Sequence, residues 1–205
     1  MRTIPQKDAR NRLAAFINED RLWSRHLKMA EFGSIPKNGV NRQALSNADI
    51  AARETLISWA KPHGFGVTQD KIGNLFIRRF GKDAKASPVM TGSHMDSQPC
   101  GGRFDGIYGV LAGLEALEAL EGAGIRTSRP IDVVAWTNEE GSRFDPGCMG
   151  SMVYTGVAEV ADFESTKDAE GILFSDALAK TLKATSVDGE RPLTEPVSAY
   201  IETHI

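Results

Sequence analysis

The sequence predicts an α/β fold in which helices pack on a parallel sheet. Two apolar runs, "SPVMTGSH" and "IDVVAWTNEE", have the length and composition of buried strands. Between them, "DGIYGVLAGLEALEALEGAG" places apolar residues at helical spacing. A strand, a helix and a second strand in this order form a βαβ unit, in which the two strands are parallel.

The elements before this unit are two helices and a hairpin. Residues 11–30 carry apolar residues at helical spacing, which predicts an amphipathic helix. After the turn-rich "GSIPKNG", residues 46–64 predict a second helix, which Ser46 or Asn47 caps. The stretch "GVTQDKIGNLFIRRFG" then predicts two strands around a turn.

The elements after the unit are shorter. We expect a short helix at "CMGSMVYTGV", a helix at "ILFSDALAKTL", a polar loop and a final strand in "VSAYIETHI". The sequence stops at His204-Ile205 inside this last predicted strand, with no turn or polar tail. We therefore expect a truncated chain, and the sequence leaves open whether it is a natural product or one half of a split protein.

Composition excludes several classes of protein. At 205 residues and 22.2 kDa, one domain is the expectation. No apolar run approaches the roughly 20 residues of a membrane span, and the net charge of −3 comes with no basic stripe for nucleic acid. The polar N-terminal segment is no secretory signal, and two cysteines, Cys100 and Cys148, agree with a reducing compartment. A cytoplasmic protein is the expectation.

Candidate functional residues follow both strands of the βαβ unit. "TGSHMDSQPCGGRFDG" carries His94, Asp96 and Asp105 in a glycine-rich loop, and Glu139 and Glu140 end the second strand. Each has an ordinary explanation on its own: Asp105 as a helix cap, His94 as a hydrogen-bonded loop residue, the glutamates as an exposed strand end. Because ligand sites lie at the carboxyl ends of such strands, their convergence favours a functional site.

The residue types indicate a metal site. One imidazole with two or three carboxylates suits zinc or manganese, with cobalt or nickel also possible, and a pair of ions needs a bridging carboxylate. Asp105, between glycines and a helix start, suits the bridge. Asp96 would accept the second imidazole N–H of His94 and hold the ring. Glu139 and Glu140 would divide metal binding and proton transfer between them.

These motifs resemble a known family. "TGSHMDSQPCGGRFDGIYGVLAGLEAL" followed by "WTNEEGSRFDPGCMGSMVYTG" is similar to the amidohydrolases that cleave N-carbamoyl amino acids. This hydantoinase/carbamoylase group includes β-ureidopropionase and allantoate amidohydrolase and belongs to the co-catalytic zinc aminopeptidase/deacylase superfamily. "GVNRQALSNAD" and "DKIGNLFIRRFG" also fit, so the similarity runs from about Phe32 to the end.

The resemblance implies roles for individual residues. His94 and His204 would bind the first metal ion, Asp105 would bridge two divalent ions, and Glu140 would bind the second. Glu139 would be the general base that activates water, with Asp96 grouped beside it among the catalytic residues. The implied substrate is a small ureido or amide molecule such as N-carbamoyl-β-alanine, hydrolysed to amino acid, carbon dioxide and ammonia.

The chain departs from this family after "YIETHI". Residues 1–205 would be the N-terminal part of a three-layer α/β/α catalytic domain, without the lid and dimerisation domain that the resemblance implies. A complete chain would be a homodimer. Two alternatives stay open: an aminopeptidase or deacylase of the same superfamily, and a non-catalytic fragment. The exact substrate, the native metal and the oligomeric state also stay open.

Overall fold

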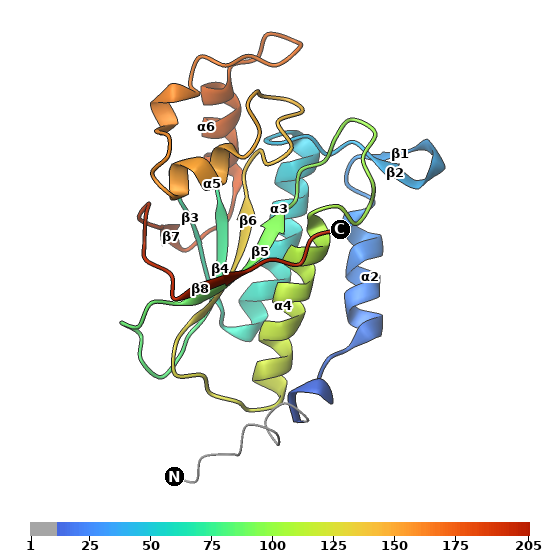
Figure 1. The fold of residues 1–205 in the computed structure, drawn as a ribbon. Helices are drawn as coiled ribbons and strands as arrows, with labels where there is room; N and C mark the ends of the chain where they lie inside the picture. Colours follow the sequence, from blue (N-terminus) through green and yellow to red (C-terminus); the bar gives the residue numbers. More distant parts are fainter. Residues whose placement is uncertain (1–11) are drawn as a thin grey trace.

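The computed structural model of the chain describes residues 12–205, and the N-terminal segment discussed above lies largely outside this part. Its elements combine a central sheet with flanking helices (Figure 1). The principal helices are α2 (Glu19–Met29), α3 (Asn47–Ala60), α4 (Ile107–Gly122), α5 (Met149–Tyr154) and α6 (Phe174–Ala184). The strands are β1 (Ser34–Ile35), β2 (Gly39–Val40), β3 (Gly66–Gln69), β4 (Leu75–Arg79), β5 (Val89–His94), β6 (Ile131–Trp136), β7 (Gly189–Glu190) and β8 (Ala199–Ile201).

The main sheet has six strands in the order β7-β3-β4-β6-β5-β8. Strand β5 pairs in parallel with both β6 and β8, which confirms the predicted βαβ unit and the predicted final strand. Strand β4 runs antiparallel to β3 and to β6. The sheet is therefore mixed, whereas the sequence predicted a parallel sheet. The reason is local, since a tight turn at residues 70–74 joins β3 and β4 and makes them a hairpin.

Helices α3 and α4 cover one face of the sheet, and α2 packs on the outer side of α4 (Figure 1). Every second residue of a strand points to the same face of the sheet. The side chains buried on this face include Val67 of β3, Leu75 and Ile77 of β4, and Val133 of β6. Ser46 caps α3 by accepting the amide hydrogen of Asp49, as one of the two predicted caps.

The opposite face of the sheet has its own apolar cluster. Phe76, Val134 and Trp136 point to this side and pack against Tyr154 of α5. Within residues 12–205, α5 and the segment leading to β8 cover this face. The third layer expected from the sequence is therefore formed by the short helix α5 and not by a long helix. The α/β class itself is confirmed.

Two predicted boundaries need correction, and three short strands were not predicted. The first helix was expected over residues 11–30, but α2 begins at Glu19, because Asn18 caps it and donates its own N–H to Glu115. The final strand ends at Ile201, which leaves His204 beyond it. The turn-rich and polar segments contain short strands, β1, β2 and β7, each of two residues.

Candidate metal centre

Three parallel strands deliver the candidate residues to one edge of the sheet. His94 is the last residue of β5 and lies opposite Trp136, the last residue of β6. Glu139 follows β6 within three residues, and His204 follows β8 within three. Since β5, β6 and β8 run in the same direction, their carboxyl ends and the residues after them gather at the same edge.

His94, Asp105 and His204 form one compact group of possible metal ligands. The Nε2 atoms of the two imidazoles are 3.3 Å apart, and Asp105 Oδ1 is 3.2 Å from His204 Nε2. His94 Nε2 and Asp105 Oδ1 are separated by 3.8 Å. The structure therefore brings together three of the six residues that the sequence nominated, from three different segments of the chain.

The spacing of this group fits a zinc-like ion. Ligand atoms about 2.0–2.2 Å from a tetrahedral ion lie roughly 3.3–3.6 Å from one another. The three separations in this group are 3.2, 3.3 and 3.8 Å, so small side-chain shifts would bring all three atoms to one ion. Two ring nitrogens that face each other across 3.3 Å also need a proton or a cation between them. Donor types and distances thus agree with a divalent ion bound by His94, Asp105 and His204.

Gly106 makes the approach of Asp105 to His94 possible. Its φ of +65° and ψ of −53° form a backbone conformation that side chains disfavour, and it is the residue before α4. A Cβ atom at this position would lie 2.2 Å from His94 Nε2. The Asp105 carboxylate makes no helix-capping hydrogen bond and is 40% exposed, so the capping explanation does not account for it.

Asp96 lies beside His94 but does not hold it in the way the sequence suggested. His94 Nδ1 is 2.9 Å from the backbone carbonyl of Asp96, whereas the Asp96 carboxylate is 3.7 Å away. That carboxylate accepts the amide hydrogens of Glu139 and Glu140, at 3.3 and 3.2 Å. The backbone turn after β5 points the Asp96 side chain at the loop after β6, so the carboxylate positions that loop. Burial raises the pKa of Asp96 to about 6.

The two glutamates of this loop point in different directions. Glu139 Oε2 is 3.4 Å from His94 Nε2, which puts its carboxylate at the rim of the ligand group. Glu140 is outside that group, and its Oε2 accepts a hydrogen bond of 2.7 Å from Gln98 Nε2. Glu140 Oε1 is buried without a hydrogen-bond partner among the described residues. Such an orphaned carboxylate oxygen is what a second cation nearby would satisfy.

Glu202 is a member of the site that the sequence analysis missed. Its carboxylate accepts hydrogen bonds of 2.6 Å from Ser93 Oγ and from Tyr200 Oη, and it is 3.0 Å from His204 Nδ1. Burial raises its pKa, but the hydrogen bonds from Ser93 and Tyr200 outweigh this and hold the pKa of Glu202 below its usual value. The Glu-Thr-His spacing could have indicated this contact, because residues i and i+2 of an extended chain point to the same side.

The other histidines and the cysteines are outside the ligand group. His26 is buried on α2 between aromatic rings, and His63 lies 3.4 Å from Glu118. Cys100 is exposed in the loop and is no ligand in this arrangement. Cys148, at the start of α5, has its sulfur 3.8 Å from Glu139 Oε1.

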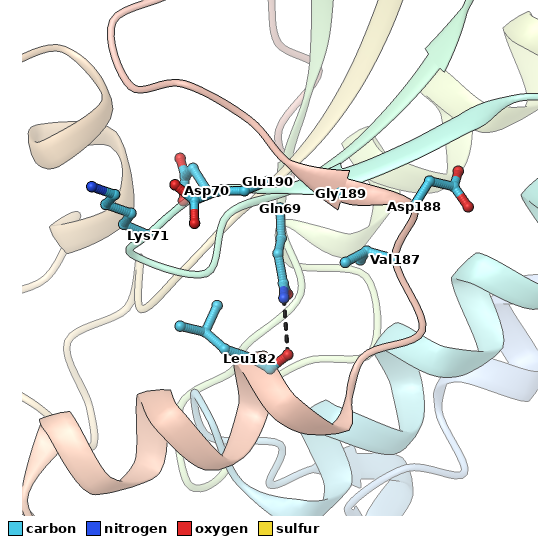
Figure 2. Close-up of a pocket in the computed structure, with 8 residues that line it drawn as sticks. All are labelled: Gln69, Asp70, Lys71, Leu182, Val187, Asp188, Gly189 and Glu190. Carbon is cyan, nitrogen blue, oxygen red and sulfur yellow. Dashed lines mark hydrogen bonds between the residues drawn. The ribbon is translucent and has the colours of Figure 1, made fainter.

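A cavity of about 400 Å³ lies at the far edge of the sheet, next to β7 and β3 (Figure 2). Figure 2 shows the Gln69 side-chain amide donating a hydrogen bond to the carbonyl of Leu182, another residue that lines the cavity. Carboxylates and one lysine line it, but none of the ligand group does. The candidate metal ligands lie on the other side of the sheet from this cavity, at the carboxyl ends of β5 and β8 and in the loops that follow. The cavity is lined by Gln69, Asp70, Lys71, Leu182, Val187, Asp188, Gly189 and Glu190.

Comparison with known proteins gives a consistent result. Residues 90–205 match the model of peptidase family M20/M25/M40. The chain is 42% identical over 189 residues to an N-carbamoyl-L-amino-acid amidohydrolase of Rhizobium meliloti, covering 92% of this chain and 45% of that protein. It is 34% identical to a ureidoglycolate hydrolase of Oryza sativa, covering 79% of this chain and 34% of the relative.

The fold also matches solved structures. A hydantoinase/carbamoylase family amidase from Burkholderia multivorans superposes with a TM-score of 0.86 at 47% identity, over 92% of this chain and 45% of that one. The chain thus spans about half the length of the N-carbamoyl-L-amino-acid amidohydrolase and of the amidase, and about a third of the ureidoglycolate hydrolase. Within residues 12–205, no helix has both the length and the apolar composition needed to cross a membrane.

Proposed function

The chain belongs to peptidase family M20/M25/M40, and from this premise we propose that it forms the N-terminal part of the catalytic domain of a metal-dependent amidohydrolase. The proposed reaction is hydrolysis of the ureido group of an N-carbamoyl amino acid, which with one water gives the amino acid, carbon dioxide and ammonia. The observation that carries the proposal is the convergence of His94, Asp105 and His204, whose ligand atoms, a nitrogen or oxygen from each side chain, all lie within 4.8 Å of one another.

The proposed metal site uses the residues at the carboxyl edge of the sheet. His94, Asp105 and His204 would hold one divalent ion, and Asp105 with Glu140 would take part in holding a second. Bound there, divalent ions would polarise the substrate carbonyl and lower the pKa of water. Zinc and manganese suit this donor set, and cobalt and nickel are outcomes of the same test.

Protein side chains would perform the proton transfer. The Glu139 carboxylate, 29% exposed and next to the ligand group, can accept a proton from the attacking water and return it to the leaving nitrogen. Asp96 would support this step indirectly, because its carboxylate holds the backbone amides of Glu139 and Glu140. We therefore assign Glu139 as the catalytic base and Asp96 as a positioning residue.

A linear ureido group is the proposed substrate feature. It is the group that the names of two kinds of relative have in common, N-carbamoyl-L-amino acid and ureidoglycolate. A peptide or acyl amide is the alternative, which the family description favours through the word peptidase. N-carbamoyl-β-alanine is one specific candidate within the ureido class.

Ammonia release tests the proposal. The purified chain, loaded with zinc or manganese, is incubated with N-carbamoyl-L-amino acids, N-carbamoyl-β-alanine, ureidoglycolate, a dipeptide and an N-acetyl amino acid. We expect ammonia from a ureido substrate, and release about 10²- to 10⁴-fold slower with Glu139→Gln. The dipeptide and the acetyl compound yield no ammonia, so their turnover is followed by chromatography of the released amino acid. Turnover of only these two compounds would favour the aminopeptidase or deacylase. Metal binding without turnover of any substrate would support the non-catalytic fragment and contradict the proposed activity of this chain.

A further inference from the structure

The carboxylate of Glu202 gathers three polar groups from two parts of the chain. Ser93 Oγ and Tyr200 Oη each donate a hydrogen bond of 2.6 Å to it, and His204 Nδ1 lies 3.0 Å from Oε1. Ser93 belongs to β5, whereas the other members follow or belong to β8. The carboxylate therefore ties the end of β8 to the neighbouring strand beside the ligand group.

The anchors of this carboxylate are themselves well fixed. Ser93 is fully buried in β5, next to His94. Tyr200 Oη accepts a hydrogen bond of 2.9 Å from Nε1 of Trp136, the last residue of β6. A continuous chain of hydrogen bonds thus runs from β6 through Tyr200 to Glu202, which restricts where the carboxylate can move.

The two histidines of the ligand group differ in what holds their rings. His94 is 1% exposed and is fixed by packing in β5 and by the carbonyl of Asp96. His204 is 41% exposed and lies beyond the end of β8. On the side of the ring that faces away from Asp105, His204 Nδ1 contacts Glu202.

This contact also determines which ring nitrogen can bind a cation. A neutral imidazole carries one proton, and a ligating nitrogen carries none. A neutral His204 that donates its Nδ1 proton to Glu202 has its lone pair on Nε2, the nitrogen that faces Asp105 and His94 at 3.2 and 3.3 Å. Histidine ligands in proteins normally need such a partner on the other nitrogen.

We propose that Glu202 is a positioning residue that holds His204 with Nδ1 protonated and Nε2 directed into the ligand group, through the hydrogen bonds it shares with Ser93 and Tyr200. The proposal rests on the metal site of the proposed function. It assigns Glu202 no contact with substrate or metal. Its effect passes entirely through the orientation and the protonated nitrogen of His204.

Zinc affinity provides the first test. Dissociation constants are measured by competition with a chromophoric chelator for the unchanged chain, Glu202→Ala and Glu202→Gln. We expect Glu202→Ala to bind zinc about 10- to 100-fold more weakly, the usual effect of removing such a partner. Glu202→Gln keeps one acceptor oxygen and should recover part of the loss. Glu190→Ala, an exposed glutamate on β7 at the opposite edge, is the matched control and should bind zinc normally.

Side-chain ¹⁵N NMR provides a readout that does not depend on metal or activity. The chain has four histidines, so the ring nitrogens can be assigned by single substitutions. In the metal-free protein, Glu202→Ala should move the Nδ1 and Nε2 shifts of His204 and leave those of His26 and His63 in place. Urea unfolding of each variant checks that the fold is intact, and a change confined to stability would contradict a positioning role.

The outcomes separate this inference from the proposed function. If the unchanged chain binds zinc, Asp105→Ala abolishes binding and Glu202→Ala matches the unchanged chain in both measurements, the proposal for Glu202 is overturned and the metal site stands. If the unchanged chain binds no zinc, the proposed metal site is overturned. The His204 shifts of the metal-free chain then still decide whether Glu202 orients the ring.

Discussion

Replacing Gly106 with alanine tests the geometry of the candidate site directly. The φ of +65° at this position disfavours any side chain, and a Cβ would lie 2.2 Å from His94 Nε2 and 2.3 Å from two ring carbons. Ordinary contacts between heavy atoms begin near 3.5 Å, so the imidazole or the backbone has to shift by about 1 Å. The expected result is a protein in which His94 no longer faces Asp105.

The magnitude follows from two separate costs. A non-glycine residue in a sparsely populated conformation costs about 1–3 kcal/mol, and overpacking a buried site costs about as much again. We therefore expect Gly106→Ala to lower the free energy of unfolding by roughly 2–6 kcal/mol, a large part of the 5–15 kcal/mol typical of a domain. Metal–ligand distances tolerate only about 0.2 Å, so zinc affinity should fall more than about tenfold.

The assay compares Gly106→Ala with Gly102→Ala in the same loop. A Cβ at Gly102 would meet no atom within 4 Å, and its φ is not in the left-handed region, so that variant should behave like the unchanged chain. Urea unfolding gives the stability of each protein, and chelator competition gives its zinc affinity. Equal stability and equal zinc affinity in the two variants would refute the close contact between Gly106 and His94.

Three further predictions follow from other parts of the molecule. Burial raises the pKa of Asp70 from 3.8 to about 6, so about 3 kcal/mol of stability that is present below pH 4 is lost as the pH rises through 6. Urea unfolding at a series of pH values should show a smaller loss in Asp70→Asn, in which Asp96 still titrates over the same range, and equal losses in the two proteins would contradict this. Arg191 donates a hydrogen bond of 2.7 Å to the buried Asp132 and stacks on the ring of Phe76, so Arg191→Ala should lower the free energy of unfolding by about 3 kcal/mol. The exposed Arg126→Ala should lower it by less than about 0.5 kcal/mol, and equal effects in the two variants would contradict this. Glu139→Gln should reduce the rate of ammonia release about 10²- to 10⁴-fold, while its zinc affinity stays within about threefold of that of the unchanged chain. An unchanged rate of ammonia release would exclude Glu139 as the base.

Elements with a clear period could be predicted from the sequence. The helix α4 and the strands β5 and β6 are long enough for their apolar patterns to indicate both type and order, and the structure confirms them. Strand β7 has two residues, too few for any periodicity, and it exists because the chain there is tied to β3. The antiparallel place of β4 between β3 and β6 is likewise a tertiary result.

The candidate site could be predicted in its residue types but not in its orientations. His94, Asp105 and His204 converge because parallel strands carry two of them to one edge of the sheet, a rule that the sequence pattern already contains. The direction of the Asp96 side chain depends on the turn after β5, and no pattern of residue types specifies that turn. For the same reason the grouping of Glu202 with Ser93 became visible only in three dimensions.

The most direct test of the metal centre is the zinc content of the purified chain. Zinc equivalents per chain are measured after dialysis for the unchanged protein, Asp105→Ala, His204→Ala and the exposed control Asp20→Ala. We predict at least one equivalent in the unchanged chain and in Asp20→Ala, and a loss of that equivalent in the other two variants. A zinc content that is zero in the unchanged chain, or equal in all four proteins, would contradict a metal site built from His94, Asp105 and His204.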